Sequence, residues 1–138
     1  MENTAKSDRP ILIVDDDLDT ARSFSALVRH LGYDTAYVTN AELVLEVAKT
    51  LKPSLIFLDL AMPSITGWEL APQIRRELGE AARIVAVSGW ADPEHHKRSR
   101  EAGFDAHVAK PVDLDLLRSI LAQIPHPPRQ WPPSSPGV

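Results

Sequence analysis

The fold of this chain is decided by the stretch Leu55-Ile56-Phe57-Leu58-Asp59-Leu60-Ala61-Met62-Pro63. It opens with four consecutive apolar residues and then places a carboxylate, that of Asp59, just before a proline-containing turn. A short apolar run between turn residues is typical of a strand buried on both faces, as in a parallel sheet. Asp59 would then stand at the carboxyl end of that strand, at the edge where open α/β sheets hold their ligands.

Four further apolar runs flank this one, and each run is followed by a segment with helical spacing. The strands are expected over residues 11–14, 35–38, 55–58, 84–87 and 106–109. The helices are expected over about residues 18–31, 40–51, 68–78, 93–102 and 114–124. Parallel strands joined by right-handed helical crossovers form an open sheet with helices on both faces. The predicted fold class is α/β, a doubly wound five-stranded parallel sheet with strand order 2-1-3-4-5.

Two of the predicted helices depart from an ordinary amphipathic pattern. Pro72 lacks a backbone N–H, so the helix near Trp68 is expected to begin late or to kink. The helix over residues 93–102 has almost no apolar face, and we expect it to pack weakly and to be the helix that shifts most easily.

Composition and charge argue against several classes of protein. The chain has 138 residues, no cysteine and a formal net charge of −4, so it offers no disulfide, no thiolate metal site and no general attraction for nucleic acid. It contains no apolar run of membrane-spanning length and no signal-peptide pattern, so a cytoplasmic protein without membrane contact is expected. Residues 1–9 are expected to form a flexible leader, residues 10–124 the folded domain and residues 125–138 a disordered, proline-rich tail.

Polar side chains follow four of the five predicted strands. Asp15 and Asp16 follow the first, Asp59 the third, Ser88 the fourth and Lys110 the fifth. Because the carboxyl ends of parallel strands meet at one edge, these side chains should converge. Three carboxylates in one crevice repel one another, and a hard cation with oxygen ligands, such as Mg²⁺, would relieve that repulsion. With a lysine and a hydroxyl beside it, such a site would stabilise phosphoryl transfer onto Asp59.

This pattern resembles the receiver domain of two-component response regulators, which has a flavodoxin-like (βα)5 fold. The resemblance covers about residues 9–124. The motifs that carry it are the acidic pair Asp15-Asp16, Asp59 with Met62-Pro63 and Gly67 behind it, Ser88-Gly89 and Lys110-Pro111.

The resemblance implies a phosphoacceptor and a metal site. Asp59 would accept the phosphoryl group. Asp16 would bind Mg²⁺ directly, Asp15 would act mainly through water, and the backbone carbonyl of Ala61 would complete the site.

The resemblance also implies which residues respond to phosphorylation. Ser88 would hydrogen-bond the phosphoryl group and move on activation, while Lys110 would pair with Asp59 and then with a phosphoryl oxygen. His107 stands where the family usually carries a tyrosine or phenylalanine that turns inward on activation. Ser88 and His107 are therefore the expected switch residues, although an imidazole is smaller and titrates near neutral pH.

The function implied is that of a stand-alone receiver that is phosphorylated by a sensor histidine kinase or a phosphotransfer protein. It would signal to a downstream protein through the fourth helix, fifth strand and fifth helix, with a homodimer left open. The chain would be no enzyme beyond catalysing the phosphorylation and dephosphorylation of its own aspartate.

Three other functions compete with this one. An aspartyl-nucleophile phosphatase of the haloacid dehalogenase kind would need a general acid where Ala61 stands. A flavodoxin-like cofactor binder would meet repulsion between the flavin phosphate and residues 15–17. A receiver-like module that is never phosphorylated would have no use for the full set of acids, serine and lysine. His95 and His96 are adjacent and point about 100° apart on a helix, which argues against a shared metal.

Overall fold

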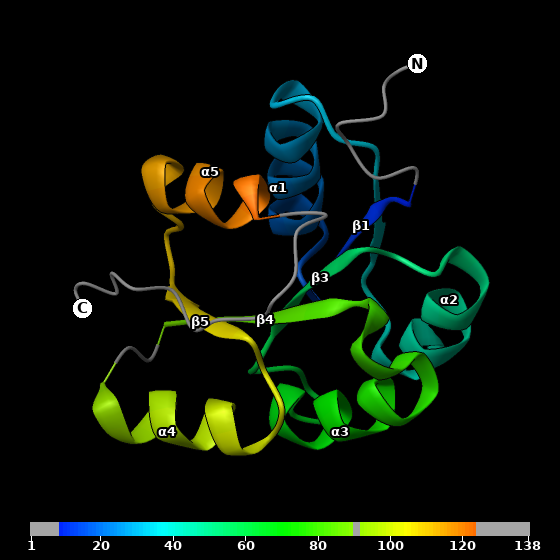
Figure 1. Ribbon diagram of the computed structural model, residues 1–138, viewed down its shortest axis with the longest axis vertical. Helices are drawn as coiled ribbons and strands as arrows, with labels where there is room; N and C mark the ends of the chain where they lie inside the picture. The colour runs from blue at the N-terminus through cyan, green and yellow to red at the C-terminus, as the bar shows by residue number, and fades with distance from the viewer. Residues whose placement is uncertain (1–8, 90–91, 124–138) are drawn as a thin grey trace.

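The computed structural model describes residues 9–89 and 92–123, which form a sheet between two layers of helices (Figure 1). The five strands are parallel and lie in the order β2-β1-β3-β4-β5, which confirms the predicted fold class. Their bounds are β1 Ile11–Val14, β2 Thr35–Val38, β3 Leu55–Asp59, β4 Arg83–Ser88 and β5 Ala106–Ala109. Apart from Arg9, the predicted leader and tail lie outside the described residues.

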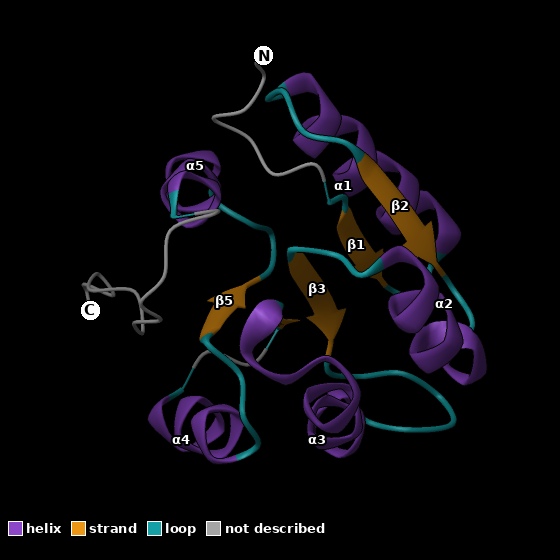
Figure 2. Cartoon of the chain, turned by 45° about the vertical axis from the view of Figure 1, so that its right-hand side comes forward, coloured by secondary structure: helices purple, strands orange, loops and turns teal. Residues whose placement is uncertain are grey.

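The helices cover both faces of the sheet, as Figures 1 and 2 show. On one face lie α1 (Leu18–His30) and α5 (Leu114–Ala122), and on the other lie α2 (Val44–Leu51), α3 (Gly67–Leu78) and α4 (Pro93–Glu101). Two 3-10 turns, η1 (Ala41–Leu43) and η2 (Gly79–Ala81), complete the described elements. Within the described ranges, no helix combines the length and the apolar character that crossing a bilayer requires.

Strand β3 lies at the centre of the core, and every one of its residues is buried. Its alternate side chains join two apolar clusters, one packed with α1 and α5 and the other with α2 and α3. The strand register places Asp59 beside Val87 of β4, and Ser88 beside Ala109 of β5. The carboxyl ends of the central strands therefore meet at one edge, as the sequence predicts.

Acidic and polar N-caps fix where most helices begin. The side chains of Asp17, Asp92 and Asp113 accept backbone N–H groups in the first turns of α1, α4 and α5, and Asn40 does the same for η1. Each of these residues satisfies a donor that a helix terminus otherwise leaves without a partner. Asp92 and Asp113 stand directly before the helices predicted over residues 93–102 and 114–124, and both helix starts are confirmed.

Of the two alternatives expected for α3, a late start or a kink, the late start is wrong. Thr66 and Glu69 form a capping box, in which each side chain accepts the backbone N–H of the other, and the helix begins at Gly67. Pro72 thus lies in the helix interior and not in its first turn. The capping box and the burial of Leu70 and Ile74 outweigh the hydrogen bond that Pro72 does not donate.

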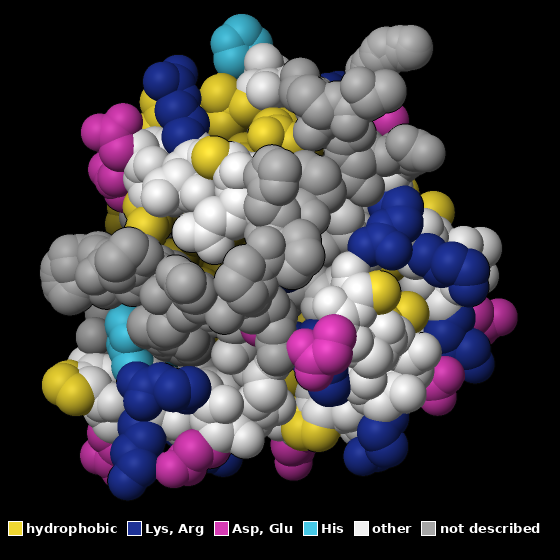
Figure 3. Space-filling view, viewed as in Figure 1, with side chains coloured by type: hydrophobic (Ala, Val, Ile, Leu, Met, Phe, Trp, Pro, Cys, Tyr) yellow, Lys and Arg dark blue, Asp and Glu magenta, His cyan; other side chains and the backbone are white. Residues whose placement is uncertain are grey.

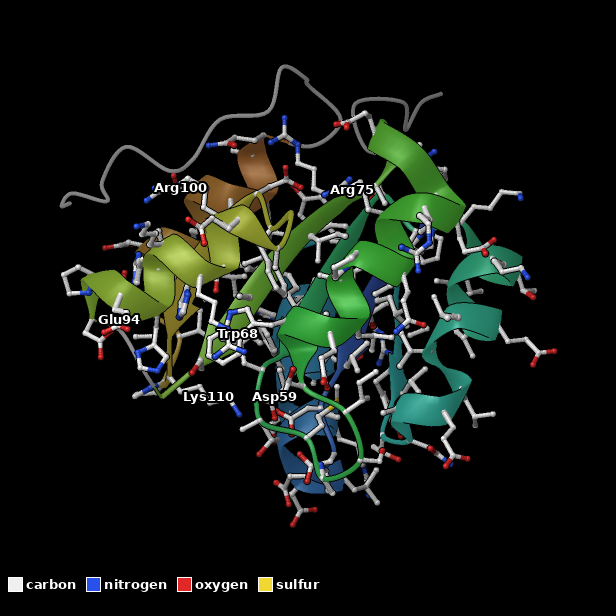
Figure 4. The ribbon with its side chains drawn as sticks, turned by 90° about the horizontal axis from the view of Figure 1, so that it is seen from below. Asp59, Trp68, Arg75, Glu94, Arg100 and Lys110 are labelled. Carbon is white, nitrogen blue, oxygen red and sulfur yellow. The ribbon has the colours of Figure 1, made fainter. Side chains whose placement is uncertain are left out.

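Arg75 and Asp105 join α3 to the amino ends of β4 and β5. The Arg75 guanidinium lies 3.0 Å from the Asp105 carboxylate and also donates to the backbone carbonyls of Ala82 and Gly103. The same carboxylate accepts the backbone N–H of Ile84 at 2.8 Å. Both side chains are largely buried, and each offsets the charge of the other there. Figure 4 shows Arg75 at the far end of α3 from Trp68.

The start of α3 approaches the end of β3 very closely. The backbone N–H of Gly67 donates to the carbonyl of Leu60 at 3.0 Å. A Cβ atom on Gly67 would lie 2.8 Å from Leu60 Cδ2 and 2.9 Å from the backbone oxygen of Asp59. Position 67 therefore has room for glycine alone unless the segment after Asp59 shifts.

Gly67→Ala should destabilise the domain by about 1–3 kcal/mol, because the added methyl overpacks against the backbone of Asp59. Urea unfolding followed by circular dichroism measures the change. The matched control is Gly89→Ala, where a Cβ meets nothing within 4 Å and the backbone is not left-handed. Equal effects of the two substitutions would contradict this account.

Candidate functional site

Three carboxylates meet at the carboxyl edge of the sheet, around the Asp59 label of Figure 4. Asp15 and Asp59 are buried, whereas Asp16 is exposed. One oxygen from each of the three lies within 4.8 Å of the others. Hard cations such as Mg²⁺ and Ca²⁺ prefer oxygen ligands, so these three residues have the donor chemistry to hold a divalent cation.

Backbone N–H groups orient the two buried carboxylates. Asp59 Oδ1 accepts the N–H of Ala61 at 3.0 Å, and Asp15 Oδ1 accepts the N–H of Asp17 at 2.9 Å. The second oxygen of each carboxylate faces Lys110, whose Nζ lies 3.2 Å from Asp15 Oδ2 and 3.5 Å from Asp59 Oδ2. Lys110 therefore bridges the two acids: it forms the expected ion pair with Asp59 and lies closer still to Asp15.

The electrostatics of the site favour an added cation. Burial raises the pKa of Asp59 to about 6, and the charges of Asp15 and Asp16 act in the same direction, against the Ala61 N–H and Lys110. Burial acts to lower the pKa of Lys110, but the negative charges of Asp59 and Asp15 outweigh it and raise that pKa above its ordinary value. Lys110 thus stays charged, yet one lysine does not offset the acids.

The structure brings Ser88 to the same edge. Ser88 is buried at the end of β4, and its backbone carbonyl accepts the N–H of Lys110 at 2.8 Å. Ala61 follows Asp59 by two residues and is exposed. The five residues expected at the carboxyl edge of the sheet therefore lie at that edge, and Ala61 stands beside them.

His107 lies behind this edge and contacts α4. It is buried on β5, its Nδ1 is 2.8 Å from Ser99 Oγ, and its ring stacks on that of His96 with centroids 4.3 Å apart. The expected switch position is thus part of the contact between β5 and α4.

The side chains that anchor α4 are not among the predicted site residues. Trp68 Nε1 donates to Ser99 Oγ at 3.0 Å, the guanidinium of Arg98 lies 4.0 Å above the Trp68 ring, and His95 stacks on the same ring. Helix α4 therefore has little aliphatic anchorage, as expected, but it has polar and aromatic contacts in its place. The signal was present in the sequence, because positions 95, 98 and 99 have the i, i+3, i+4 spacing of one helix face.

A cleft of about 590 Å³ opens beside the acids, between α1 and the segment that leads into α5. Asp15 and Lys110 line it together with Asp19 and Thr20 of α1. The remaining wall is mainly apolar and includes Ile13, Phe24, Leu27, Phe57, Val87 and Val112.

Fold and site together define an α/β domain with an acidic pocket at the carboxyl edge of a doubly wound sheet. Residues 11–122 match the family model of the response regulator receiver domain. The chain belongs to that family, and its function is that of a receiver in phosphorelay signalling. Receiver domains bind a divalent metal at their acidic site, interact with histidine kinases or phosphotransfer proteins, and are generally not enzymes in the ordinary sense.

Individual relatives agree with this assignment. Sporulation initiation phosphotransferase F of Bacillus subtilis is 28% identical over 108 residues, which are 78% of this chain and 86% of that protein. The sensor histidine kinase RcsC of Salmonella typhimurium is 32% identical over 123 residues, which are 88% of this chain and 13% of that protein. The structure of a CheY-like receiver domain from Methylobacillus flagellatus matches with a TM-score of 0.75 and 31% identity, over 86% of this chain and 99% of that one.

Asp59→Asn should stabilise the metal-free domain. The pKa of Asp59 rises on folding from 3.8 to about 6. The free energy of unfolding therefore falls as the pH rises through that range, and it remains at the lower value at higher pH. At neutral pH the neutral amide should therefore raise the free energy of unfolding by up to about 3 kcal/mol, measured by urea unfolding with a chelator present.

Adding Mg²⁺ should then stabilise the wild-type chain and leave Asp59→Asn almost unchanged. Asp19→Asn removes an exposed carboxylate near the amino end of α1 and serves as the control. Its free energy of unfolding is expected to lie within about 0.5 kcal/mol of the wild-type value. A metal-free wild type that is at least as stable as Asp59→Asn would contradict the electrostatic account.

Proposed function

We propose that Asp59 is the residue that receives the phosphoryl group, in a reaction that requires Mg²⁺. One observation carries this assignment: the buried Asp59 carboxylate, with a pKa raised to about 6, shares its surroundings with two further carboxylates and with Lys110. A nucleophile in such a place attacks phosphorus only when the surrounding negative charge is offset.

The transfer is a single displacement at phosphorus. A carboxylate oxygen of Asp59 forms the new O–P bond while the N–P bond of the donor phosphohistidine breaks, and the bonding electrons return to the imidazole nitrogen. Lys110 lies 3.5 Å from Asp59 Oδ2, within reach of an oxygen of the incoming group. The Ser88 hydroxyl would bind another of its oxygens. Water later hydrolyses the acyl phosphate, and the chain acts on no other substrate.

The proposed metal ligands are Asp15, Asp16, Asp59 and the backbone carbonyl of Ala61. The carboxylate oxygens within 4.8 Å of one another support this set, and hard oxygen donors favour Mg²⁺, which keeps several of its waters. The bound ion would offset the charge of both the acids and the phosphoryl oxygens.

The phosphodonor is proposed to dock over the cleft beside α1. Leu18, in the first turn of α1, is 47% exposed, and Leu114, in the first turn of α5, is 40% exposed. An apolar side chain of a sensor histidine kinase or phosphotransfer protein that entered the cleft would bring its phosphohistidine close to Asp15 and Lys110. The relatives named as a sensor histidine kinase and a phosphotransferase support this class of partner.

The response is proposed to pass through Ser88 and His107 to the face formed by α4, β5 and α5. A downstream protein, or a second copy of the chain, would bind there. Residues 10–124 form the receiver in this proposal, residues 1–9 a leader and residues 125–138 a tail, and the protein acts in the cytoplasm without binding nucleic acid or membrane.

Acetyl phosphate with Mg²⁺ should add one phosphoryl group to the intact chain, detected by mass spectrometry. Asp59→Asn should abolish the modification, and removal of the metal by a chelator should reduce its rate by at least about 100-fold, because Asp15 and Asp16 then repel the anionic donor.

Asp19→Asn serves as the matched control and should be phosphorylated at nearly the wild-type rate. Lys110→Ala should retain some phosphorylation but lose most of the conformational response. If Asp59→Asn still gains a phosphoryl group at the wild-type rate, or if chelation changes nothing, the proposed site is wrong.

Beryllofluoride, which mimics an aspartyl phosphate, should alter amide hydrogen exchange mainly between residues 88 and 117. Helix α4 has few aliphatic contacts and follows Ser88 closely, so its rearrangement should require little free energy. Mass spectrometry of peptides, with Asp59→Asn as the control that cannot bind the mimic productively, measures the effect. Changes confined to α1 and α2 would refute this route.

A further inference from the structure

Four side chains hold α4 against β5 and α3, and we call them the α4 latch: His96 and Ser99 of α4, His107 of β5 and Trp68 of α3. The His96 and His107 rings lie nearly parallel, 9° apart in orientation, with centroids separated by 4.3 Å. Ser99 is fully buried and bonded to both His107 and Trp68. Two of the four side chains are imidazoles, whose ordinary pKa lies near neutral pH.

The hydrogen bonds of the latch fit a neutral His107. The indole Nε1–H of Trp68 is a donor only, so Ser99 Oγ accepts from it. In the tautomer of neutral His107 that carries its hydrogen on Nε2, Nδ1 can accept the hydroxyl hydrogen of Ser99. In an imidazolium both ring nitrogens are donors, and Ser99 would then face two donors and need another acceptor for its hydrogen.

The charges on α4 also oppose protonation. Burial lowers the pKa of His96, and Arg100 one turn further along adds to this effect, while Asp92 acts in the opposite direction. Lys97 and Arg98 are exposed on the same helix. The remaining titratable groups of α4 are His95, whose Nδ1 lies 2.6 Å from Asp92, and the exposed Glu94 and Glu101. Figure 3 shows the charged and histidine side chains that gather over α4.

The other elements around the latch add no compensating negative charge at the described contacts. Strand β4 pairs Ala86 with His107, and α3 contributes the uncharged Trp68. Asp105, just before β5, forms an ion pair with Arg75. Lys110, three residues beyond His107, is a further cation and is bound to Asp15.

We propose that the α4 latch is a proton-operated switch: a proton taken up from solvent by the stacked His96 and His107 releases α4 from β5 without phosphorylation. When α4 moves away, His96 becomes hydrated and its charge is no longer opposed by burial. Proton binding and displacement of α4 therefore promote each other by linkage. This inference goes beyond the proposed function, because it requires neither a phosphoryl donor nor a metal.

The test measures amide hydrogen exchange of α4 in the full chain carrying Asp59→Asn. This background removes the Asp59 carboxylate, whose own pKa of about 6 lies in the same range. Exchange is compared between about pH 7.5 and about pH 5.5 after correction for the intrinsic rate, with α2 as the internal reference. The opening equilibrium of α4 should rise on the order of threefold or more at the lower pH, while that of α2 should not.

Adding His96→Gln should remove this rise, because glutamine keeps a planar polar group but does not titrate. Adding His30→Gln, at the end of α1 and away from the latch, should leave the rise unchanged. No rise in the Asp59→Asn chain, or an equal rise with His96→Gln, would overturn the proposal.

A second measurement stands if His96→Gln fails to fold. The indole N–H resonance of Trp68, assigned with Trp68→Phe, should shift in the Asp59→Asn chain with an inflection in the histidine range, because Ser99 joins Trp68 to His107. A resonance that does not change between about pH 7.5 and about pH 5.5 would refute the switch.

Discussion

The repulsion among carboxylates that the sheet holds together is the constraint on which the rest of this structure depends. Strand pairing places Asp15 and Asp59 at neighbouring strand ends, so their backbones cannot move apart without breaking the register of β1 and β3. Burial then raises the pKa of Asp59 to about 6 and makes its charge costly. The site is stable only when positive charge lies beside the carboxylates, and Lys110 supplies part of that charge.

Helix α4 differs from α1 and α5 in how it is attached to the sheet. Helices α1 and α5 pack on an aliphatic and aromatic cluster that includes Phe57 of β3. Helix α4 packs through an indole, a hydroxyl and two imidazoles, whose hydrogen bonds depend on orientation and on protonation. Aliphatic contacts tolerate small shifts, whereas a directional contact is either made or broken, which suits an element with two distinct positions.

Much of the fold and the site could be predicted from the sequence, because both depend on local signals. Apolar runs located the strands, Asp92 and Asp113 marked helix starts, and the residues that end parallel strands had to meet. The role of Pro72 was harder to foresee, because a capping box formed by Thr66 and Glu69 decides where α3 begins.

Contacts between elements explain the other differences. Leu114 has the apolar spacing of Leu117 and Leu121 in α5, but it is 40% exposed whereas those two are buried. The side chains that anchor α4 could not be predicted, because serine and histidine usually lie at the surface. Only the approach of α3 and β5 turns Ser99 into a buried hydrogen-bonding residue.

The ion pair of Arg75 and Asp105 holds the carboxyl end of α4. Gly103, just past the carboxyl end of the helix, is bound to the same guanidinium that holds Asp105, and this carboxylate is bound in turn to the start of β4. The amino end of the helix lies on the side of the acidic pocket, where the rings of His95 and His96 stack on those of Trp68 and His107. A displaced α4 would therefore rotate about Gly103. Its displacement would increase along the helix and would be largest at the first turn, the end that follows Ser88.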